Sequence, residues 1–469
     1  MTTLKAEILN ALSTYGDSKI IDGNVNRAYS FKEIFKEINE LERSFEGMDF
    51  RQKVVVFDFH ENSIDLVILL LFVLKKGGIP LIIELSGLSS EVTNKLMYYA
   101  IVRHKSSMLS VENNIQFTSR NTKYGTFLIT NNLLNISSYR ECTLLLTSSG
   151  TVGAKKIMKF ESPGILSNIR SNIKALRITK NDTTLMCLPI YYSYSLIGQF
   201  FSHLLQGANI IIAPYRFVAF SIGRLIDQYK PTNFFTTPTQ VNILLSNKLT
   251  KGDLGLRFIT VGGGYLNKYS FQRFSKKYPA EVYYKTYGIT EAGPRVATYT
   301  VNYSDAAYFE PNYLGTPLNK VGMSLCEKVG NYDNFDTGFL RITSPSIFKG
   351  YLLHKSEYDQ QKDHLVTEDI VYRKDDKVYI LGRNTDRFHY EDKHLWRFEV
   401  EDTINEQFSG ILKIKLKKDG QNFQLGVMKH PKSKVGFDDI HKALNQRFGS
   451  KFTKNLTIGK FNERFAFTK

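Results

Sequence analysis

Short apolar runs alternate with helix-length segments from the N-terminal part of the chain onward. Val54–Phe57 and Ile79–Ile83 are continuous apolar runs of strand length, and Ser63–Lys76 between them has the length of a helix. Gly77-Gly78 marks the end of that helix, because glycine commonly follows the last helical turn. Strands that are apolar throughout are typical of parallel sheets buried on both faces. The pattern therefore predicts a β-α-β unit in a parallel sheet.

The same order of elements recurs further along the chain. Thr184–Pro189 and Asn209–Ala213 are predicted strands, and they flank a predicted apolar helix over Ser195–Gly207. Asn233–Phe235 and Arg257–Val261 are predicted as further strands with helices between them. Alternating strands and helices of this kind indicate an α/β fold with mainly parallel sheets covered by helices.

The pattern changes near Gly382–Asp386, where the polar segment GRNTDR interrupts the α/β order. Apolar residues and lysines then alternate over Leu412–Lys417, which predicts a half-buried strand. Asp419-Gly420 predicts a hairpin turn into a second strand over Phe423–Met428, and an amphipathic helix follows. We therefore predict a large α/β N-terminal domain over residues 1–383 and a small α+β C-terminal domain over residues 384–469.

Composition limits the classes of partner. The 469 residues are 42% hydrophobic and 23% charged, as in ordinary globular proteins, and they carry a net charge of +17. Such a surface favours anionic partners, among them nucleotides, coenzyme A, acidic carrier proteins and nucleic acid. The basic residues are spread along the whole chain, which disfavours nucleic acid because nucleic-acid binding usually gathers them in one patch or arm.

Cysteine usage and the lengths of apolar runs bear on location. Cys142, Cys187 and Cys326 are odd in number and far apart, so neither a disulfide framework nor a zinc site is predicted. The longest apolar run, Leu66–Leu74, is too short to cross a bilayer and is predicted as a buried helix. The N-terminus lacks the apolar core of a signal peptide. We expect a cytoplasmic protein without a membrane span.

The segment Leu144–Lys156 (LLLTSSGTVGAKK) carries the most chemistry. A strand-like run leads into a loop of hydroxyls, glycines and lysines, which suits a polyphosphate ligand. The residues that supply these groups are Thr147, Ser148, Ser149, Gly150, Thr151, Gly153, Lys155 and Lys156. The loop is not a Walker loop, because only two residues separate its glycines. A solvated hairpin loop explains the same residues equally well.

Four further segments are modest signals when each is taken alone. Val261–Leu266 (VGGGYL) leads a strand into three glycines, where a flat ring can lie against the backbone, although a tight turn explains it too. Tyr287–Glu291 (YGITE) sets an aromatic ring, a hydroxyl and a carboxylate close together. Thr367–Asp369 (TED) and Val378–Arg383 (VYILGR) put an acid and an arginine on a predicted hairpin, or else in a surface salt bridge. Gly459-Lys460 lies near the C-terminus, where a solvated basic tail is the alternative.

In this order and spacing the five segments resemble the adenylate-forming superfamily, which includes acyl-CoA synthetases, adenylation domains of peptide synthetases and luciferases. The resemblance extends from the first β-α-β unit to Lys460. It implies ATP-dependent activation of a carboxylic acid to an acyl-adenylate, with release of pyrophosphate. It also implies that the small domain then swings, so that a phosphopantetheine thiol takes the acyl group.

The resemblance implies a set of nucleotide contacts. The loop that ends at Lys156 would hold the β- and γ-phosphates of ATP, with Lys156 at the family's lysine position. Tyr287 would stack on the adenine, with Gly288 next to it. Asp369 would bind both ribose hydroxyls, and Arg383 would lie beside the ribose. The turn packed on the adenine would consist of Gly262, Gly263 and Gly264.

Three residues would act on the reacting groups. By resemblance, Thr290 contacts the α-phosphate, Glu291 holds Mg²⁺, and Lys460 bridges the substrate carboxylate and the α-phosphate. A carboxylate that attacks a phosphate brings two anions together, so charge must be neutralised where it develops. On a mobile domain, Lys460 would supply its charge only when the site is closed.

The chain departs from the family pattern at four positions. In the phosphate loop, Val152 and Lys155 stand where the family has threonine and proline. Beyond Arg383, Thr385 replaces the usual hinge acid, and Asp392 aligns with a glycine that borders the thiol tunnel. Adenylation is therefore the firmer half of the prediction. A degenerate relative that binds nucleotide without reacting is the alternative, and a nucleic-acid-binding protein is a third reading that rests on net charge alone.

The predicted acyl pocket has tyrosines in place of charged groups. Adenylation domains for α-amino acids usually place an aspartate where Tyr194 aligns, and the segment Ile190–Gln199 contains no acid. Because an unpaired buried ammonium is costly, we predict that the substrate is not a plain α-amino acid. Tyr192 and Tyr194, with Gly262, suggest a pocket for an aryl or short acyl acid, although the tyrosines can equally be core residues.

The acyl acceptor is predicted as a phosphopantetheine thiol on a separate, acidic carrier protein, because the chain contains no carrier domain and its charge is +17. An acyl-CoA ligase that uses free coenzyme A is the alternative, since coenzyme A is also anionic. The predicted cofactors are ATP and Mg²⁺, and no nucleic-acid partner is expected.

Overall fold

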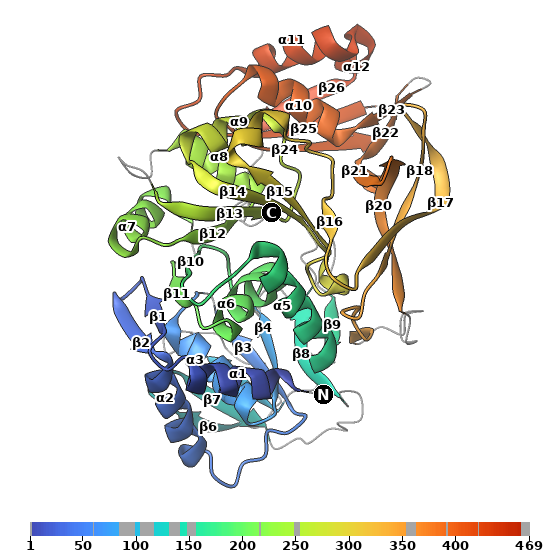
Figure 1. The fold of residues 1–469 in the computed structure, drawn as a ribbon. Helices are drawn as coiled ribbons and strands as arrows, with labels where there is room; N and C mark the ends of the chain where they lie inside the picture. Colours follow the sequence, from blue (N-terminus) through green and yellow to red (C-terminus); the bar gives the residue numbers. More distant parts are fainter. Residues whose placement is uncertain are drawn as a thin grey trace.

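Two large mixed sheets organise most of the chain (Figure 1). The computed structural model describes residues 2–59, 61–83, 99–103, 117–130, 141–147, 156–214, 217–247, 254–352, 363–390, 393–420 and 422–460. In Figure 1 the eight-stranded sheet lies in the lower half, the nine-stranded sheet in the middle, and the C-terminal part at the top.

The eight-stranded sheet contains the predicted β-α-β unit. Its central strands β8, β4, β3 and β5 are parallel, and its outer strands are antiparallel. In spatial order the strands are β19 (Tyr351–Leu352), β9 (Ile157–Glu161), β8 (Cys142–Thr147), β4 (Ile79–Ile83), β3 (Val54–Asp58), β5 (Ala100–Arg103), β7 (Thr126–Thr130) and β6 (Phe117–Asn121).

The nine-stranded sheet repeats this arrangement, with parallel strands from β14 to β1 and antiparallel strands at both edges. In spatial order the strands are β16 (Thr316–Pro317), β15 (Ala297–Asn302), β14 (Ala280–Tyr287), β13 (Leu256–Gly262), β12 (Asn233–Thr236), β10 (Thr183–Met186), β11 (Asn209–Ile212), β1 (Lys19–Asp22) and β2 (Arg27–Ser30). The predicted α/β class with mainly parallel sheet centres is therefore what the structure contains.

Helices cover these sheets, and their ends follow local sequence signals. Ser30 and Glu33 form a capping box on α2, and Pro238 stands at the start of α8 after the cap residue Thr237. The helices are α1 (Leu4–Thr14), α2 (Phe31–Ser44), α3 (Ile64–Lys75), α5 (Ser162–Leu176), α6 (Ser202–Leu205), α7 (Ala219–Tyr229), α8 (Pro238–Ser246) and α9 (Lys268–Lys277).

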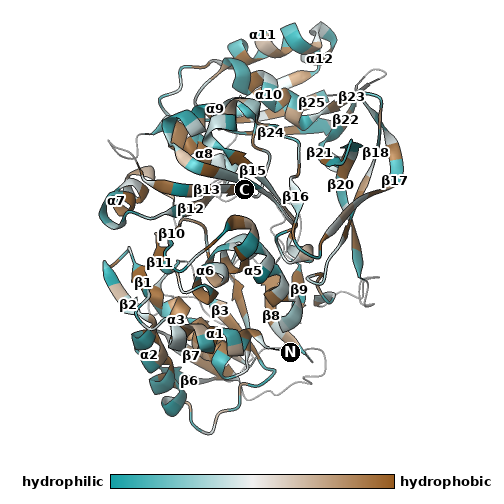
Figure 2. Cartoon of the chain, in the orientation of Figure 1, coloured by the Kyte–Doolittle hydropathy of each residue, from teal (hydrophilic) through white to brown (hydrophobic). Residues whose placement is uncertain are grey.

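Helix α3 confirms the prediction of a buried apolar helix. Every residue of Leu66–Leu74 is buried, since the helix packs within the largest core cluster. Figure 2 shows the contrast with α2, whose outer face is hydrophilic. Among the residues that the structure describes, no helix is long and apolar enough to cross a membrane.

The helix expected over Ser195–Gly207 is the main local difference from the sequence prediction. The structure has a π-helix, η3 (Tyr194–Phe201), which continues into the short α6. Its wider turns release carbonyl groups from the usual ladder, and side chains bind them: Asn172 donates to Gly198 O at 2.7 Å, and Ser202 to Ile197 O at 3.0 Å. The π-helix thus depends on tertiary partners that hydrophobic periodicity does not reveal.

The strand expected over Thr184–Pro189 is also shorter than predicted, because β10 ends at Met186. Beyond Met186, the side chain of Asn62 makes the backbone hydrogen bonds that a neighbouring strand would otherwise make. Asn62 Nδ2 donates to Leu188 O at 2.9 Å, and its Oδ1 accepts from the amide of Ile190 at 2.8 Å. The segment that leads into η3 is therefore tied to the N-terminal sheet region.

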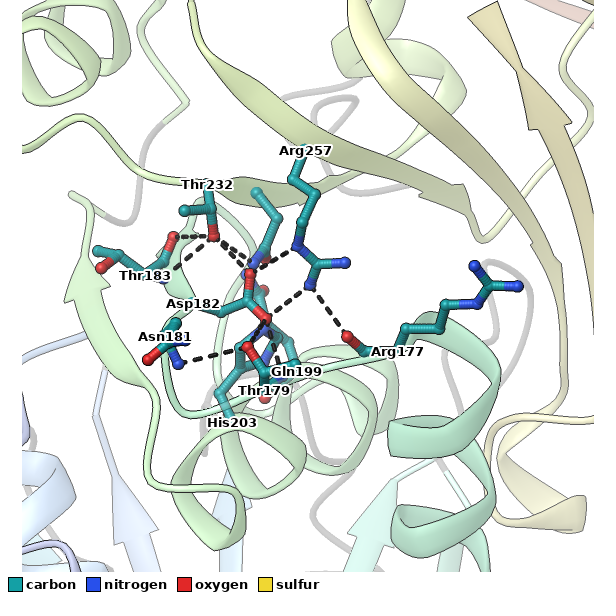
Figure 3. A network of polar contacts seen from close by, with 10 residues as sticks. Arg177, Thr179, Asn181, Asp182, Thr183, Gln199, His203, Thr232 and Arg257 are labelled. Carbon is teal, nitrogen blue, oxygen red and sulfur yellow. Dashed lines mark hydrogen bonds and ion pairs between the residues drawn. The ribbon is translucent and has the colours of Figure 1, made fainter.

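A buried polar network lies at the other end of the nine-stranded sheet (Figure 3). Asp182 accepts hydrogen bonds from Arg257 at 2.6 and 3.0 Å, from Thr232 at 2.7 Å and from the Thr179 amide at 2.8 Å. Burial raises the pKa of Asp182, but these bonds outweigh it and hold the pKa below its usual value. The network joins the amino-terminal ends of β10, β12 and β13. It therefore holds these strands together at the end of the sheet opposite to their carboxyl ends.

The remaining elements form an antiparallel sheet and the C-terminal part. The antiparallel strands, in order, are β17 (Gly322–Tyr332), β18 (Phe335–Thr343), β20 (His364–Lys374) and β21 (Lys377–Arg383). After them come β22 (Arg387–Tyr390), β23 (Lys393–Trp396), α10 (Arg397–Gln407), β24 (Ile411–Asp419), β25 (Asn422–Lys429), α11 (Phe437–Phe448), α12 (Ser450–Lys454) and β26 (Leu456–Lys460).

β24 and β25 pair antiparallel, which confirms the hairpin predicted from the sequence, although Asp419 still belongs to β24 and lies opposite Asn422. A separate apolar cluster underlies this sheet and its helices. Trp396 packs instead with Ile370 and Leu381 of the antiparallel sheet. A domain boundary at residue 383 stays a prediction.

Candidate active site

Two of the sequence motifs follow neighbouring parallel strands. Gly262 ends β13 and Tyr287 ends β14, and Gly262 lies opposite Thr286 in the register of the two strands. Carboxyl ends of parallel strands meet at one edge of a sheet, which is where open α/β sheets bind ligands. The fold therefore brings VGGGYL and YGITE side by side.

Glycine is favoured at each of these motif positions for a different physical reason. A Cβ on Gly262 would lie 2.4 Å from Thr286 Oγ1 and 3.0 Å from Cζ of Tyr194, so no side chain fits there. Gly263 has a φ of +80°, which favours glycine. A Cβ on Gly288 would lie 1.7 Å from the carbonyl oxygen of Pro294. Gly263 and Gly264 are exposed, which leaves their backbone open to a flat ring.

The three residues expected at the adenosine lie together. Tyr287 donates its hydroxyl to Asp369 Oδ2 at 2.5 Å, and Arg383 Nε lies 3.5 Å from Asp369 Oδ1. Asp369 and Arg383 face each other across the predicted hairpin, which β20 and β21 form. The surface-salt-bridge alternative does not describe this pair well, because Asp369 is buried even though Arg383 is largely exposed.

Asp369 has an unusual electrostatic setting. Burial raises the pKa of Asp369 above its ordinary value and Asp386 adds to the rise, although Tyr287 and Arg383 lower it. A lower pH therefore neutralises this carboxylate sooner than an exposed aspartate. The neutral acid accepts weaker hydrogen bonds than the carboxylate, so its protonation weakens any site that uses it as an acceptor.

If Asp369 accepts hydrogen bonds from both ribose hydroxyls, as the resemblance implies, D369N should raise the KM for ATP by about 10-fold or more, because those bonds would lose their charge assistance. In the wild type, the KM for ATP should rise as the pH falls through the raised pKa of Asp369, and D369N should lack this rise. Steady-state kinetics from mildly acidic to neutral pH measures both. The control is D376N, which neutralises an exposed acid between the same two strands. An unchanged KM in D369N contradicts the ribose assignment.

A second group of side chains surrounds Glu291. Tyr351 donates its hydroxyl to Glu291 Oε1 at 3.3 Å, and Lys156 Nζ lies 4.9 Å from the centre of the Tyr351 ring. β19 pairs with β9, so Tyr351 stands beside the strand that Lys156 precedes. Thr290 is buried, and its hydroxyl lies 3.0 Å from that of Ser193. Lys156, Thr290 and Glu291 thus come from distant segments to one region.

The phosphate-loop strands are described, but most of the loop is not. Thr147 ends β8 opposite Ile157 of the antiparallel strand β9, so the loop is a hairpin connection. This geometry is compatible with a phosphate-binding loop and with a solvated hairpin loop, since a hairpin loop can also hold a phosphate. Outside the described residues lie Ser148, Ser149, Gly150, Thr151, Val152, Gly153, Lys155 and, further along, Asp392.

The donor set around Glu291 suits Mg²⁺ better than a metal held by protein ligands alone. Among the described residues, no group of three or more His, Cys, Asp or Glu side chains could hold a metal ion. Mg²⁺ commonly takes one or two carboxylates and completes its shell with substrate phosphates and water. Glu291 is half-buried and turns one oxygen to Tyr351, so its carboxylate fits the role of such a single ligand.

Lys460 lies apart from these groups. It is the exposed last residue of β26, and none of the interactions found between described residues joins it to Thr290 or Glu291. Polar contacts between the C-terminal part and the nine-stranded region run elsewhere. Tyr265 donates to Asp402 at 2.8 and 3.0 Å, and Asn242 donates to Leu412 O at 3.2 Å.

The two predicted pocket tyrosines differ in their surroundings. The Tyr194 hydroxyl lies 2.6 Å from Thr260 Oγ1, and its ring approaches Gly262. Tyr192 packs edge-on against the ring of Tyr191 at 4.8 Å. Burial raises the pKa of Tyr194, so this phenol stays neutral at physiological pH. The structure therefore brings Tyr194 and Gly262 together.

Two residues near these motifs were not anticipated from the sequence. Tyr351 contacts Glu291, and Arg295 is only 1% exposed although it carries a charge. The one available signal for Arg295 was a lone charge at the head of an apolar, strand-like segment. Burial lowers the pKa of Arg295 to about 10, which leaves it protonated at neutral pH. Burying such an ion without a counter-charge costs several kcal/mol.

Comparison with known proteins agrees with this geometry. A family model described as AMP-binding enzyme matches residues 102–352. The chain is 23% identical to a protein named putative long chain fatty acid-CoA ligase VraA from Staphylococcus epidermidis, over 77% of this chain and 73% of that protein. It is 28% identical to a 4-coumarate–CoA ligase 2 from Nicotiana tabacum, over 54% of this chain and 49% of that protein. The chain thus spans about half the length of the latter relative.

Solved structures share the fold over nearly the whole chain. O-succinylbenzoate coenzyme A synthetase from Bacillus subtilis, in complex with AMP, has a TM-score of 0.76 at 16% identity, over 98% of this chain and 96% of that chain. The anthranilate CoA ligase AuaEII, in complex with anthranoyl-AMP, has a TM-score of 0.78 at 15% identity, over 100% of this chain and 95% of that chain. These likenesses confirm the predicted fold class.

Proposed function

This chain belongs to the AMP-binding enzyme family, and we propose that it activates a carboxylic acid by joining it to AMP. Membership confirms that the chain is related to adenylate-forming enzymes, as its five motifs predicted. The proposed reaction has two steps, formation of an acyl-adenylate and transfer of the acyl group to a thiol.

The arrangement around Glu291 is the observation that carries the proposal. Tyr351 donates a hydrogen bond to Glu291, and Lys156 makes a cation–π contact with the ring of Tyr351. Thr290 directly precedes Glu291 in the chain. In the first step, a carboxylate oxygen of the acid bonds to the α-phosphorus while the bond to the bridging oxygen breaks, and pyrophosphate leaves. Lys156 would hold the departing phosphates, and Thr290 would donate to the α-phosphate. Bound Mg²⁺, with Glu291 as its protein ligand, would neutralise charge on the phosphates.

The adenosine half of ATP would lie across the ends of β13 and β14. Exposed backbone at Gly263 and Gly264 would support one face of the adenine, and Tyr287 the other. Asp369 would accept both ribose hydroxyls beside Arg383. The closeness of Tyr287 to Asp369 supports this placement, since base and sugar of one nucleotide need neighbouring groups.

The proposal includes movement of residues 384–469. Lys460 lies apart from Glu291 and Thr290, so a role at the α-phosphate requires this part of the chain to move. In the second step, a thiolate would attack the acyl carbon, and AMP would leave. The thiol would belong to phosphopantetheine, either on a separate acidic carrier protein, as the +17 charge favours, or in coenzyme A, as the names of the relatives favour.

Acid-dependent exchange of labelled pyrophosphate into ATP tests the first step. We expect exchange with an aryl or short acyl acid and none with plain α-amino acids, because the segment Ile190–Gln199 offers no carboxylate to an ammonium group. If no acid in a panel of aryl, fatty, short acyl, dicarboxylic and amino acids supports exchange, the proposal is wrong and the protein is better described as a non-catalytic relative. Turnover with a carrier protein and with coenzyme A, side by side, tests the second step. Failure with both would remove the thioester step.

A further inference from the structure

Arg295 is a cation buried from solvent. Its Nη2 donates to Thr298 Oγ1 at 3.1 Å, while its Nε and Nη1 have no hydrogen-bond partner within the part of the chain that the structure describes. Within that same part, none of the ion pairs involves Arg295. A guanidinium has five N–H donors and cannot lose its proton under ordinary conditions, so most of its hydrogen-bonding capacity remains unused.

The position of Arg295 is fixed by its neighbours, although several of its N–H donors are unused. Asn168 fixes its backbone, because Asn168 Nδ2 donates to Arg295 O at 2.8 Å and Asn168 Oδ1 accepts from the Arg295 amide at 3.3 Å. The stem packs against η3, where a Cβ on Gly198 would lie 3.5 Å from Arg295 Cδ. The aliphatic part of Arg295 therefore lies within van der Waals reach of the π-helix at Gly198.

Neighbouring groups do not replace a counter-ion. The guanidinium carbon lies 5.7 Å from the centre of the Tyr194 ring, near the outer limit for a cation–π contact. Such a contact is far weaker than the penalty for burying an ion. Burial lowers the pKa of Arg295, and among the described residues Tyr194 is the one ionisable group that raises it. A purely structural arginine would be expected to have a carboxylate or several carbonyl groups around it.

Arg295 also stands beside the proposed acyl pocket. Tyr194 contacts both Thr260 and Gly262, and its ring faces the guanidinium. Arg295 follows Glu291 by four residues in the chain, and its guanidinium carbon lies 5.7 Å from the centre of the Tyr194 ring. A substrate that extends from the α-phosphate along Tyr194 would bring its distal end towards this charge.

We propose that Arg295 binds a second anionic group of the substrate, so that the enzyme activates a dicarboxylic acid at the carboxylate remote from Arg295. The inference rests on the proposed function and specifies the class of acid. The distal carboxylate would accept charge-assisted hydrogen bonds from the unused donors of Arg295. The same charge would repel the ammonium of an α-amino acid, which agrees with the lack of an acid in Ile190–Gln199.

The test compares matched acids on the full chain: succinate with butyrate, glutarate with valerate, and phthalate with o-toluate. In pyrophosphate exchange, we expect kcat/KM for one diacid to exceed that of its monoacid partner by at least about 30-fold, because a buried charge pair is made only with the diacid. In a parallel binding assay without ATP, the preferred diacid should raise the Tm, and its monoacid partner should not. Exchange with monoacids alone would overturn the inference and leave the proposed function standing.

R295M separates a binding role from a structural one. It should lower the diacid kcat/KM by at least about 30-fold, leave the monoacid kcat/KM within a few-fold, and abolish the Tm shift by the diacid. Its own Tm should be equal to or above that of the wild type, because an unpaired buried charge is replaced by an apolar side chain. R224M, on the exposed face of α7, is the matched control and should change none of these.

The outcomes distinguish the two proposals. If no acid supports exchange, the proposed function is wrong, while a Tm shift by a diacid that R295M abolishes still supports the anion site. If neither exchange nor binding prefers a diacid in the wild type, the inference is overturned without any variant. A sharp loss of Tm in R295M would assign Arg295 to the fold and would count against the inference.

Discussion

K460A should lower acid-dependent exchange of pyrophosphate into ATP by about 100-fold or more, which is the scale expected when one charge-stabilising group is removed from a transition state. The attacking carboxylate and the α-phosphate are both anions, and the lysine would neutralise charge that grows as they meet. Lys460 is exposed at the end of β26, so the Tm should stay the same.

The second half-reaction provides the sharper check on this prediction. If Lys460 acts only on adenylate formation, K460A should transfer the acyl group from a supplied acyl-adenylate to the thiol at nearly the wild-type rate. K454A removes the same charge from an exposed position in α12, and its exchange should be unchanged. Exchange by K460A within twofold of the wild type would remove the assignment of Lys460 and, with it, the reason to propose movement of residues 384–469.

The second large effect is expected from E291Q, which should reduce kcat for exchange by about 100-fold and raise the Mg²⁺ concentration needed for half-maximal rate. Glutamine keeps the shape of the side chain and can still accept from the Tyr351 hydroxyl, so the change isolates the loss of charge. A titration of Mg²⁺ at saturating ATP measures both quantities.

Two controls accompany E291Q. E281Q neutralises an exposed acid at the start of β14 and should behave as the wild type. Y351F keeps the ring beside Lys156 but removes the hydrogen bond to Glu291, so it should lower the rate only several-fold, as expected for one neutral donor. If E291Q shows an unchanged Mg²⁺ requirement, Glu291 is not the metal ligand.

Several features of the fold were readable from local pattern. The continuous apolar runs at β3 and β4, the capped apolar helix α3 and the turn at Asp419-Gly420 each depend on neighbours in sequence, and each appears in the structure. The hairpin that pairs Asp369 with Arg383 was likewise expected from strand patterning. Local signals of this kind suffice because backbone propensity and one-sided burial act over a few residues.

Other features depend on groups that are distant along the chain. The π-helix over Tyr194–Phe201 is stabilised by Asn172 of α5, which no periodicity within the segment reveals. Tyr351 reaches Glu291 because the two-residue strand β19 pairs with β9, and a strand that short has no pattern of its own. The placement of VGGGYL beside YGITE became visible only in the register of β13 and β14.

The sequence by itself determined most of the order of elements, the family and the set of residues proposed to carry the chemistry, because these are recorded in short patterns and their spacing. Only the tertiary structure decided which side chains meet and which are cut off from water. Arg295 shows the difference: in the sequence it is one of 62 lysines and arginines, and in the fold it is a buried charge with unused donors beside Tyr194. Burial is a property of the whole packed chain. The free-energy cost of the unpaired charge of Arg295 therefore arises only once the fold has formed.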